Sequence, residues 1–381
     1  MTISSSDIAS MCIAPQDSIR QAMACIDDHP HGHAHGIVLV VDGDRRLLGT
    51  VTDGDIRRAL LNGLTLDSAI REAMKGNPIV APGSLPGPAL RKLMEANTIH
   101  HLPIVDDDGR VIALEYLNTA AAGEDKMVTA VVMAGGKGQR LRPLTEKVPK
   151  PMLPIEKRPI LDILLESLQT TGFNRVLISV GYLKEAIQDY FEDGSSRGLD
   201  IHYLVESEPL GTAGALSLIP EALKPSTPFL VINGDLLTRL NFAAFRDFHM
   251  AADYEFTLCC RPHEVGIPYG YPVIEGDLVT DFREKPSFNF LVNSGIYCLS
   301  PELLGDVPQN TFFNMTDLIH RLCKTRRRVG VFPLREPFHE IGRPESYQDA
   351  VEFYQEHFEP HSNRLNGAIH ELLQETQGAI G

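Results

Sequence analysis

Three uninterrupted apolar segments in the C-terminal two-thirds of the chain constrain its fold most strongly. They are Val128–Met133, Val176–Val180 and Pro228–Ile232. Two segments with apolar residues at helical spacing, Pro159–Thr171 and Leu183–Tyr190, lie between them. Short apolar strands that alternate with helices are typical of a parallel sheet with both faces covered. Ligands of such sheets bind beyond the carboxyl ends of the strands, so we expect the functional site in the loops that follow them.

The loop after the first strand, residues 134–155, is rich in glycine and in basic residues. Gly135, Gly136 and Gly138 would let backbone N–H groups approach a triphosphate closely. Residues 137–150 contain five cations and one anion, in a chain whose net charge is −15. The cations are Lys137, Arg140, Arg142, Lys147 and Lys150. This local positive charge predicts an anion-binding site, and the alternative is a basic loop that only faces solvent.

The loop does not match two common phosphate-binding motifs. The pattern G-x-x-x-x-G-K-[ST] of P-loop proteins is absent. Four prolines keep the segment extended where a dinucleotide-binding turn needs a helix. Asp162 has nearly the spacing of a ribose-binding acid, but it falls inside a predicted helix. A dehydrogenase or another nucleotide-cofactor fold is therefore a weak hypothesis, the third after the two given at the end of this subsection.

The charge and the apolar pattern also exclude classes of partner. A chain of net charge −15 repels nucleic acids and anionic membranes. No apolar run approaches the roughly 18 residues of a membrane helix, and the N-terminus has no signal-peptide pattern. None of the six cysteines forms a C-x-x-C pair, so we interpret them as reduced thiols. We expect a cytoplasmic protein.

An internal repeat occupies the N-terminal third. Leu39–Gly49 matches Pro103–Ala113 at a shift of 64 residues, and each copy is expected to form a strand, an acidic turn and a second strand. Two copies of one such unit usually pack against each other. The expected division of the chain is a repeat domain at 1–122, a linker at 123–127, a larger domain at 128–355 and a helical tail at 356–381.

The first copy ends in a strand that leads into a helix, with Thr52 and Asp55 at the join. A hydroxyl and free N–H groups at a helix N-terminus suit a phosphate, and a carboxylate three residues later suits ribose hydroxyls. The alternative is that Asp53 or Asp55 caps the helix and Thr52 merely ends the strand.

This third of the chain resembles a tandem pair of cystathionine-beta-synthase-type (CBS) domains, whose nucleotide site has the pattern G-x-V-T-x-x-D. The matching residues are Gly49, Val51, Thr52 and Asp55. The resemblance implies an α+β fold and an adenine nucleotide bound at Thr52 and Asp55. It also implies a homo-oligomer, a dimer or larger, assembled through the pair. The second copy has Tyr116 and Thr119 instead, so a second nucleotide site is not expected.

A histidine-rich stretch, His29–Gly36, lies within the first copy. Alternating histidines can hold a divalent ion. No carboxylate or cysteine ligand set lies nearby in the sequence, so we interpret this stretch as a solvent-exposed loop.

The pattern G-G-x-G-x-R-L-x-P-L-T, followed by P-K-P-M-L-P, resembles the signature of sugar-1-phosphate nucleotidyltransferases. The resemblance extends over about residues 128–350, because six further motifs follow in the family's order. They are EPLGTAGAL (Glu208–Leu216), NGD (Asn233–Asp235), YGYPV (Tyr269–Val273), REKP (Arg283–Pro286), NSGIY (Asn293–Tyr297) and HEIGRPESY (His339–Tyr347). The implied fold is α/β, a Rossmann-like sheet of mixed or parallel strands similar to GT-A domains.

The resemblance implies roles for individual residues. Arg140 would contact the leaving phosphates, Lys150 the α-phosphate and Lys285 the incoming sugar phosphate. The nucleotide-binding residues would be Ala134, Gly135, Gly136, Gly138, Glu206, Gly211, Thr212 and Ala213.

Sugar and metal ligands follow from the same resemblance. Glu284 and Asn293 would bind sugar hydroxyls, and the backbone at Gly270 would approach the ring. Asp235 and Glu340 would share Mg²⁺, although glutamate stands where the family usually has aspartate. The alternatives are that Asp235 is only a turn residue and that Glu284–Lys285 is only a surface ion pair.

The expected reaction transfers a nucleoside monophosphate from a nucleoside triphosphate to a hexose 1-phosphate, such as glucosamine 1-phosphate or mannose 1-phosphate. GTP is favoured because L-G-T-A-G resembles the turn of guanylyltransferases, and because CBS-fused relatives resemble the glucosamine-1-phosphate guanylyltransferases of legionaminic acid biosynthesis. Uridylyl or cytidylyl transfer stays open. The second functional hypothesis is a nucleotide-sensing protein with impaired catalysis, motivated by Glu340.

Overall fold

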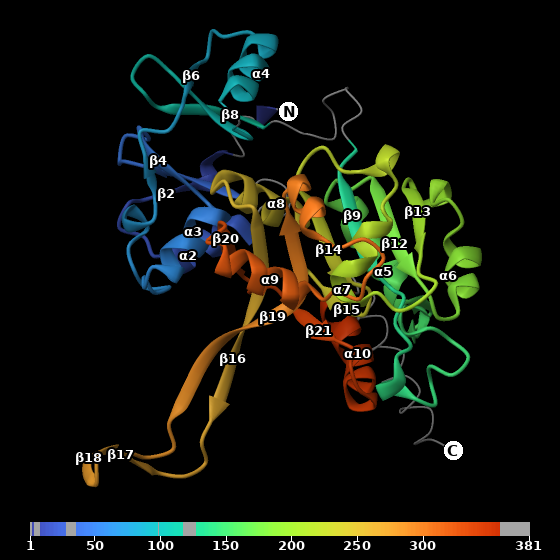
Figure 1. Cartoon of the computed structure of the whole chain (residues 1–381). Coiled ribbons are helices and arrows are strands. Elements are labelled where there is room, and N and C mark those ends of the chain that lie inside the picture. Colours follow the sequence, from blue (N-terminus) through green and yellow to red (C-terminus); the bar gives the residue numbers. More distant parts are fainter. Residues whose placement is uncertain (1, 4–7, 28–35, 98, 117–126, 359–381) are drawn as a thin grey trace, which may run out of the picture. The chain divides into compact units, whose positions relative to one another are not determined.

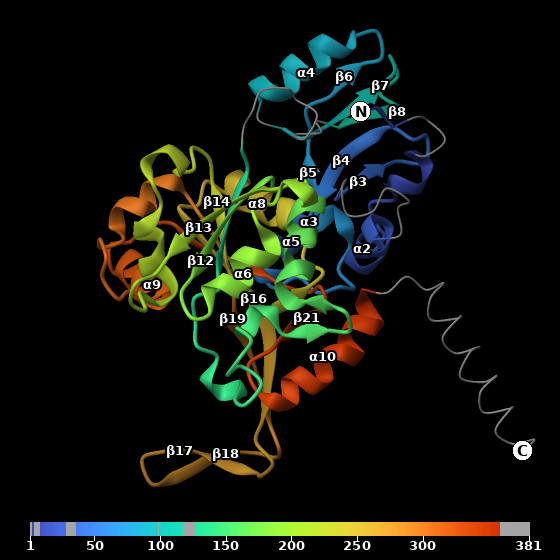
Figure 2. The same ribbon diagram turned by 90° about the vertical axis from the view of Figure 1, so that its right-hand side faces the viewer.

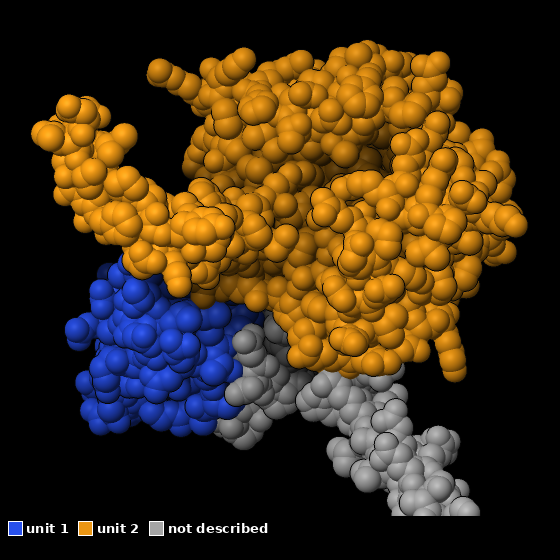
Figure 3. Space-filling view, turned by 90° about the horizontal axis from the view of Figure 1, so that it is seen from below, with its two compact units in different colours: residues 1–126, 241–252 blue, residues 127–240, 253–381 orange. Residues whose placement is uncertain are grey.

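The computed structural model describes residues 2–3, 8–27, 36–97, 99–116 and 127–358. The chain forms two compact units, which Figure 3 colours separately. Unit 1 contains residues 1–126 and 241–252, and unit 2 contains residues 127–240 and 253–381. The segment 241–252 thus belongs to unit 1, although the sequence analysis assigned it to the larger domain. Among the described residues, no helix has the length and apolar character needed to cross a membrane.

Unit 2 is built on a seven-stranded sheet with the order β13-β12-β9-β14-β19-β16-β20. The strands are β9 (Thr129–Met133), β12 (Arg175–Val180), β13 (Asp200–Val205), β14 (Phe229–Asn233), β16 (Phe256–Gly266), β19 (Ser287–Leu299) and β20 (Val329–Pro333). Only β19 runs antiparallel to its neighbours within this sheet. The expected α/β sheet of mixed or parallel strands is confirmed, and it is mixed and mostly parallel.

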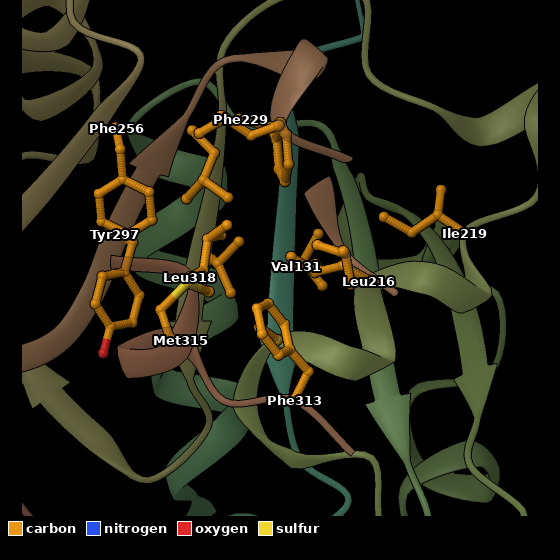
Figure 4. Close-up of a cluster of buried hydrophobic side chains, with 14 of the residues drawn as sticks. Val131, Leu216, Ile219, Phe229, Phe256, Tyr297, Phe313, Met315 and Leu318 are labelled. Atoms are coloured by element: carbon orange, nitrogen blue, oxygen red, sulfur yellow. The ribbon is translucent and has the colours of Figure 1, made fainter. Parts of the chain in front are cut away.

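Both faces of the sheet are covered. Ala130, Val131 and Val132 of β9 are all fully buried, although successive side chains of a strand point to opposite faces. Figures 1 and 2 show the helices that accompany the sheet. They are α5 (Ile160–Thr170), α6 (Lys184–Phe191), α7 (Gly211–Gly214), α9 (Met315–Lys324) and α10 (Pro344–His357). The buried cluster of Figure 4 joins Val131 and Phe229 of the sheet to Leu318 of α9.

Strands β16 and β19 continue beyond the sheet as a long arm, which ends in β17 (Tyr271–Glu275) and β18 (Leu278–Arg283) (Figure 1). A register shift between Cys259 and Cys260 marks the place where the arm leaves the sheet. Eight large apolar side chains of the arm are exposed: Val265, Tyr269, Ile274, Leu278, Val279, Phe282, Phe290 and Leu291.

Smaller elements complete unit 2 at the edge where the arm emerges. Strand β15 (Leu236–Thr238) pairs antiparallel with β21 (Phe338–Glu340), and β10 (Pro154–Ile155) pairs with β11 (Arg158–Pro159). The loop after β9 contains two short 3-10 helices, η4 (Gln139–Leu141) and η5 (Lys150–Met152).

Unit 1 contains two four-stranded sheets, with the orders β2-β3-β4-β5 and β1-β8-β7-β6. The strands are β1 (Thr2–Ile3), β2 (Cys12–Ile13), β3 (Ile37–Val41), β4 (Leu47–Thr52), β5 (Lys75–Gly76), β6 (Ala81–Pro82), β7 (His101–Val105) and β8 (Val111–Tyr116). The helices are α2 (Ile19–Asp27), α3 (Asp53–Leu61), α4 (Gly87–Ala96) and α8 (Phe242–Ala251).

The internal repeat is confirmed by strand register. Ile37 pairs with Thr52 in the first hairpin, and His101 pairs with Tyr116 in the second, 64 residues later in both strands. Arg46 and Arg110, which correspond at the same shift, form an antiparallel bridge between the copies. The two copies are therefore related by a local pseudo-two-fold arrangement.

Candidate functional site

The glycine-rich loop after β9 is folded back on itself by buried polar contacts. The hydroxyl of Thr145, which is fully buried, donates to the carbonyl of Gly138 at 2.8 Å. Gly138 has φ +58°, and a Cβ at this position would lie 3.1 Å from Cβ of Lys150. The loop therefore needs glycine here, both for its left-handed backbone and for the close approach of Lys150.

Lys150 and Asp235 are 85 residues apart in sequence, yet the Lys150 ammonium donates to Oδ2 of Asp235. Their side chains are only 13% and 17% exposed. Asp235 follows β14, where the N–H of Gly234 donates to the carbonyl of Met133 at the end of β9 (2.9 Å). The predicted catalytic lysine and the predicted metal ligand thus meet at the carboxyl ends of neighbouring parallel strands.

Glu340 lies in the strand that pairs with the residues following Asp235. Leu236 is the register partner of Glu340, and the N–H of Ile341 donates to the Asp235 carbonyl at 3.1 Å. Oδ1 of Asp235 is buried and has no hydrogen-bond partner among the described residues. A buried carboxylate oxygen without a donor suits a hard cation, and Mg²⁺ commonly takes one or two carboxylates together with substrate phosphate. The residues present therefore fit this ion.

Glu206, directly after β13, has both carboxylate oxygens engaged within the protein. Oε1 accepts from the Ser179 hydroxyl, and Oε2 accepts from the N–H of Leu210 at 2.8 Å. A Cβ on Gly135 would overlap Oε1 of Glu206. Glu206 therefore fixes the start of the turn before α7 and the position of the glycine-rich loop, while its direct contact with a nucleotide stays a prediction.

The turn Gly211–Ala213 is held by the segment that precedes α9. Gly211 has φ +78°, and a Cβ there would lie 2.8 Å from the carbonyl oxygen of Phe313. The hydroxyl of Thr212 accepts from the N–H of Met315 at 2.9 Å, and the N–H of Ala213 donates to the Phe313 carbonyl at 3.0 Å. These contacts fix the backbone of the predicted nucleotide-binding turn.

Two other predicted residues of the phosphate region differ in burial. Ala134 is 2% exposed, and its N–H donates to the carbonyl of Ser179 at 2.9 Å. Arg140, in η4, is exposed, as are Gly136 and Lys137 of the same loop. The contact of Arg140 with the leaving phosphates and the contact of Gly136 with the nucleotide stay predictions.

Gly270, Glu284 and Lys285 lie on the arm. A Cβ on Gly270 would overlap the Glu284 carboxylate, so these two residues are neighbours. Six ladder positions separate the pair Cys260–Asn293 from the pair Gly266–Ser287, a distance of about 20 Å at ~3.3 Å per residue. The structure therefore does not place Lys285 in the cluster of Lys150 and Asp235.

Asn293 lies at the root of the arm, beside the turn that carries Asp235. Its amide donates to the Tyr297 hydroxyl at 2.7 Å, and its Oδ1 accepts from the N–H of Gly295 at 3.1 Å. Gly295 is in turn packed so closely on Asn233 that a Cβ would overlap the amide of that residue. The sequence analysis gave Tyr297 and Asn233 no individual role, and the only available signal was that they are the last residue of NSGIY and the first residue of NGD.

In unit 1, Thr52 and Asp55 form a capping box at the start of α3. The N–H of Asp55 donates to the Thr52 hydroxyl at 3.2 Å, and the N–H of Thr52 donates to Oδ2 of Asp55 at 2.9 Å. Oδ1 of Asp55 also pairs with Arg58 at 2.6 Å. The helix is therefore capped, as the alternative interpretation expected, but the N-cap residue is Thr52. That interpretation was wrong in expecting Thr52 merely to end the strand. Nucleotide binding here stays a prediction.

Several remaining residues received sequence predictions. All six cysteines are free thiols, as expected. Asp162 lies inside α5 and pairs with Arg158 at 2.8 Å, which agrees with its rejection as a ribose-binding acid. The histidines of residues 29–35 and Thr119 lie outside the described residues, as do most of the linker and the tail beyond residue 358.

Two family models match the chain. The model described as "Nucleotidyl transferase" matches residues 129–357, which include β9, Asp235 and Glu340. The model of the CBS domain matches residues 3–62 and 70–114, which cover the two copies of the repeat.

Named relatives match about half of the chain. The chain is 31% identical over 242 residues to the UTP–glucose-1-phosphate uridylyltransferase of Synechocystis sp. (58% of this chain, 62% of the relative). It is 37% identical over 187 residues to the mannose-1-phosphate guanylyltransferase of Mycobacterium tuberculosis (48% and 51%). It is 32% identical over 222 residues to the D-glycero-alpha-D-manno-heptose 1-phosphate guanylyltransferase of Campylobacter jejuni (57% and 96%). The chain thus spans between one half and two thirds of the first two relatives and nearly all of the third.

Proposed function

Because this chain belongs to the nucleotidyl transferase family and carries CBS domains at its N-terminus, we propose that it is a sugar-1-phosphate nucleotidyltransferase. It transfers a nucleoside monophosphate from a nucleoside triphosphate to a sugar 1-phosphate and releases pyrophosphate. The observation that carries the proposal is the buried contact of Lys150 with Asp235, beside an Asp235 oxygen that has no partner among the described residues.

The reaction joins two anions. A phosphate oxygen of the sugar 1-phosphate forms a bond to the α-phosphorus, and the bond from that phosphorus to the bridging oxygen breaks. The electron pair leaves with pyrophosphate. Charge neutralisation therefore matters more than proton transfer. Lys150 neutralises the α-phosphate and Arg140 the leaving phosphates. Lys285 lies on the arm, away from this cluster, so a contact of Lys285 with the incoming phosphate requires the arm to fold towards the site. One positioned donor of this kind contributes about 3 kcal/mol to transition-state stabilisation.

Asp235 and Glu340 would hold Mg²⁺. When bound, the ion supplies positive charge to the phosphate oxygens. The bond from Lys150 to Oδ2 supports this assignment, because it fixes the Asp235 carboxylate and leaves Oδ1 as the oxygen available for a ligand.

We propose GTP as the nucleotide and a hexose 1-phosphate, such as mannose 1-phosphate or glucosamine 1-phosphate, as the acceptor. The guanylyltransferases of M. tuberculosis and C. jejuni support the guanine base by their names and their identity to this chain. The Synechocystis relative, named as a uridylyltransferase, supports UTP as the alternative.

Pyrophosphate release tests this function directly. GTP, UTP and CTP would each be assayed with a panel of hexose 1-phosphates, using the wild type and Lys150→Ala. We expect the substitution to lower kcat at least a hundredfold, since one electrostatic donor is lost. Lys324→Ala is the control, because Lys324 is an exposed lysine in the last turn of α9. Equal rates in the wild type and Lys150→Ala would remove Lys150 from the mechanism.

A nucleotide-sensing protein with impaired catalysis is the second candidate. Glu340 favours it, since its side chain is one methylene longer than the aspartate of the family pattern and is exposed. Mg²⁺-dependent binding of GTP without turnover for any sugar phosphate would support this candidate, and turnover by the wild type would exclude it.

For unit 1, we propose that an adenine nucleotide binds at Thr52 and Asp55 and alters transferase activity, with a coupling of about 1–3 kcal/mol. The ligand would have to replace bonds of the capping box, which predicts modest affinity. Calorimetry with AMP, ADP and ATP on the wild type and Asp55→Asn tests the site, and thermal unfolding of both proteins checks that the fold persists. Absence of binding to the wild type would leave assembly as the role of the CBS pair.

The remaining proposals concern the localisation, the assembly and the partners of the protein. We propose a cytoplasmic homo-oligomer, a dimer or larger, that is assembled through the CBS pair and binds neither nucleic acid nor membranes. Sedimentation over a range of protein concentrations tests the oligomer, and a monomer at all concentrations would overturn it.

A further inference from the structure

Tyr297 places a buried hydroxyl at the root of the arm. The residue is 5% exposed, and Figure 4 shows its ring in the core cluster, with the oxygen at one end. The ring centroid lies 5.7 Å from that of Phe256. A buried tyrosine hydroxyl usually has a specific hydrogen-bond partner. Here that partner is Asn293, whose amide nitrogen donates to the hydroxyl at 2.7 Å.

An irregularity in β19 brings these two residues together. Cys259 pairs with Ile296, but the next residue, Cys260, pairs with Asn293. Ser294 and Gly295 are therefore extra residues in β19, which is the arrangement of a β-bulge. The hydroxyl of Ser294 secures the bulge by donating to the Cys259 carbonyl at 2.7 Å. Bulges commonly re-aim a side chain near an active site, and this one re-aims Asn293.

The orientation of the Asn293 amide is determined by two contacts. Its oxygen must face the N–H of Gly295, which donates to it at 3.1 Å, and its nitrogen must therefore face Tyr297. One hydrogen of the amide nitrogen remains for a ligand. The Tyr297 hydroxyl accepts from Asn293, and in the part of the chain that the structure describes no acceptor takes its own proton.

The surroundings keep this hydroxyl protonated. Burial raises the pKa of Tyr297, the hydrogen bond from Asn293 lowers it by a smaller amount, and the charges of Cys260 and then Glu340 raise it further. Tyr297 thus remains neutral at physiological pH.

We propose that Tyr297 is a positioning residue for sugar recognition: by accepting a hydrogen bond from Asn293, its hydroxyl holds the amide so that the remaining amide N–H donates to an oxygen of the sugar 1-phosphate. This inference rests on the proposed function. It assigns to the root of the arm one fixed donor, the remaining N–H of the Asn293 amide, which recognises a ring hydroxyl or a phosphate oxygen of the sugar 1-phosphate.

The variant Tyr297→Phe removes the hydroxyl and retains the ring, so the core stays filled. We expect KM for the sugar 1-phosphate to rise about five- to tenfold, the effect of one lost hydrogen bond. We expect kcat and KM for the nucleoside triphosphate to change less than twofold. Tyr203→Phe is the matched control, because its hydroxyl bonds to the Glu192 carbonyl at 2.7 Å and the edge strand β13 carries it.

A double-mutant cycle with Asn293→Ala separates positioning from a structural effect. If Tyr297 acts through Asn293, then Tyr297→Phe raises KM for the sugar phosphate in the wild-type background and changes it less than twofold in the Asn293→Ala background. An unchanged KM in Tyr297→Phe, or the same increase in both backgrounds, would overturn the inference. Absence of turnover by the wild type with every substrate would overturn the proposed function and this inference together.

Discussion

At the scale of single residues, neighbouring glycines of the phosphate loop have different surroundings. A Cβ on Gly135 would overlap the Glu206 carboxylate, whereas a Cβ on Gly136 would meet nothing within 4 Å. Glu206 holds the N–H of Leu210 and the hydroxyl of Ser179. Gly135 is therefore needed for packing, while Gly136 leaves open space above the loop.

The variant Gly135→Ala should consequently destabilise unit 2. We expect the free energy of unfolding to fall by about 1–3 kcal/mol, the usual cost of an inserted methyl group in a packed site. Gly136→Ala is the control and should change it by less than about 0.5 kcal/mol. Urea unfolding of the three proteins measures this. Equal midpoints for Gly135→Ala and the wild type would contradict the packing role of Gly135.

At the scale of elements, helix α8 belongs to unit 1 through specific side-chain contacts. The guanidinium carbon of Arg58 in α3 lies 5.3 Å from the centre of the Phe248 ring. Nδ1 of His100 lies 3.1 Å from Oδ2 of Asp247. Since α8 begins four residues after β15 ends and Asp235 immediately precedes β15, unit 1 holds a segment that is close in sequence to the proposed metal ligand.

The His100–Asp247 contact predicts a pH-dependent stability. The hydrogen bond that His100 donates to Asp247 is the largest cause of a raised His100 pKa. Burial lowers this pKa, the Asp247 charge raises it and the Arg246 charge lowers it. The Asp247 charge also raises the pKa of Tyr116, after burial as the larger cause. Because the folded pKa is raised, the contribution is fully present below the unfolded value of about 6.5 and disappears as pH rises through the folded pKa.

Thermal unfolding of the wild type and His100→Gln from pH 5 to pH 9 measures this effect. The difference in Tm should be largest at low pH and should shrink as the pH increases. Asp247→Asn serves as the companion variant, because it removes the charge that His100 senses. A difference in Tm that is constant over the whole pH range would show that the pair does not contribute through the charge of His100.

At the scale of the whole molecule, the arm carries three predicted sugar-site residues and most of the exposed apolar side chains of unit 2. Beyond Gly266 and Ser287, the arm contacts itself through the pairing of β17 with β18 and through the bond from Ile267 N–H to the Pro286 carbonyl (2.9 Å). The core cluster contains none of these outer residues. The outer arm is therefore separable from the stability of the sheet.

Replacing residues 267–286 with Asn-Gly tests this separation, since a two-residue turn can close the ladder at Gly266 and Ser287. We expect the Tm to stay within a few degrees of the wild-type value, and nucleotidyl transfer to be lost together with Gly270, Glu284 and Lys285. Lys285→Ala in the full-length protein is the control, because it removes the amine and leaves the arm in place. It separates the loss of this charge from the loss of the arm itself. Wild-type activity of the shortened protein would exclude all three residues from the mechanism.

Local patterns in the sequence were sufficient for several of the elements and for recognising a repeat and an α/β region. The strands β9, β12 and β14, the helices α5 and α6, and the shift of 64 residues in the repeat all follow from periodicities within short segments. Such patterns depend on which faces of a segment are buried, and this is encoded locally.

Only the tertiary structure decided which distant residues meet. The contact between Lys150 and Asp235 depends on β9 and β14 being neighbours in the sheet, and no periodicity reports the order of strands. Three other features also could not be predicted from local patterns. They are the bulge that turns Asn293 towards Tyr297, the membership of α8 in unit 1 and the place of Lys285 on an arm. Each depends on pairing between segments far apart in the chain, where many arrangements would bury the same apolar residues equally well.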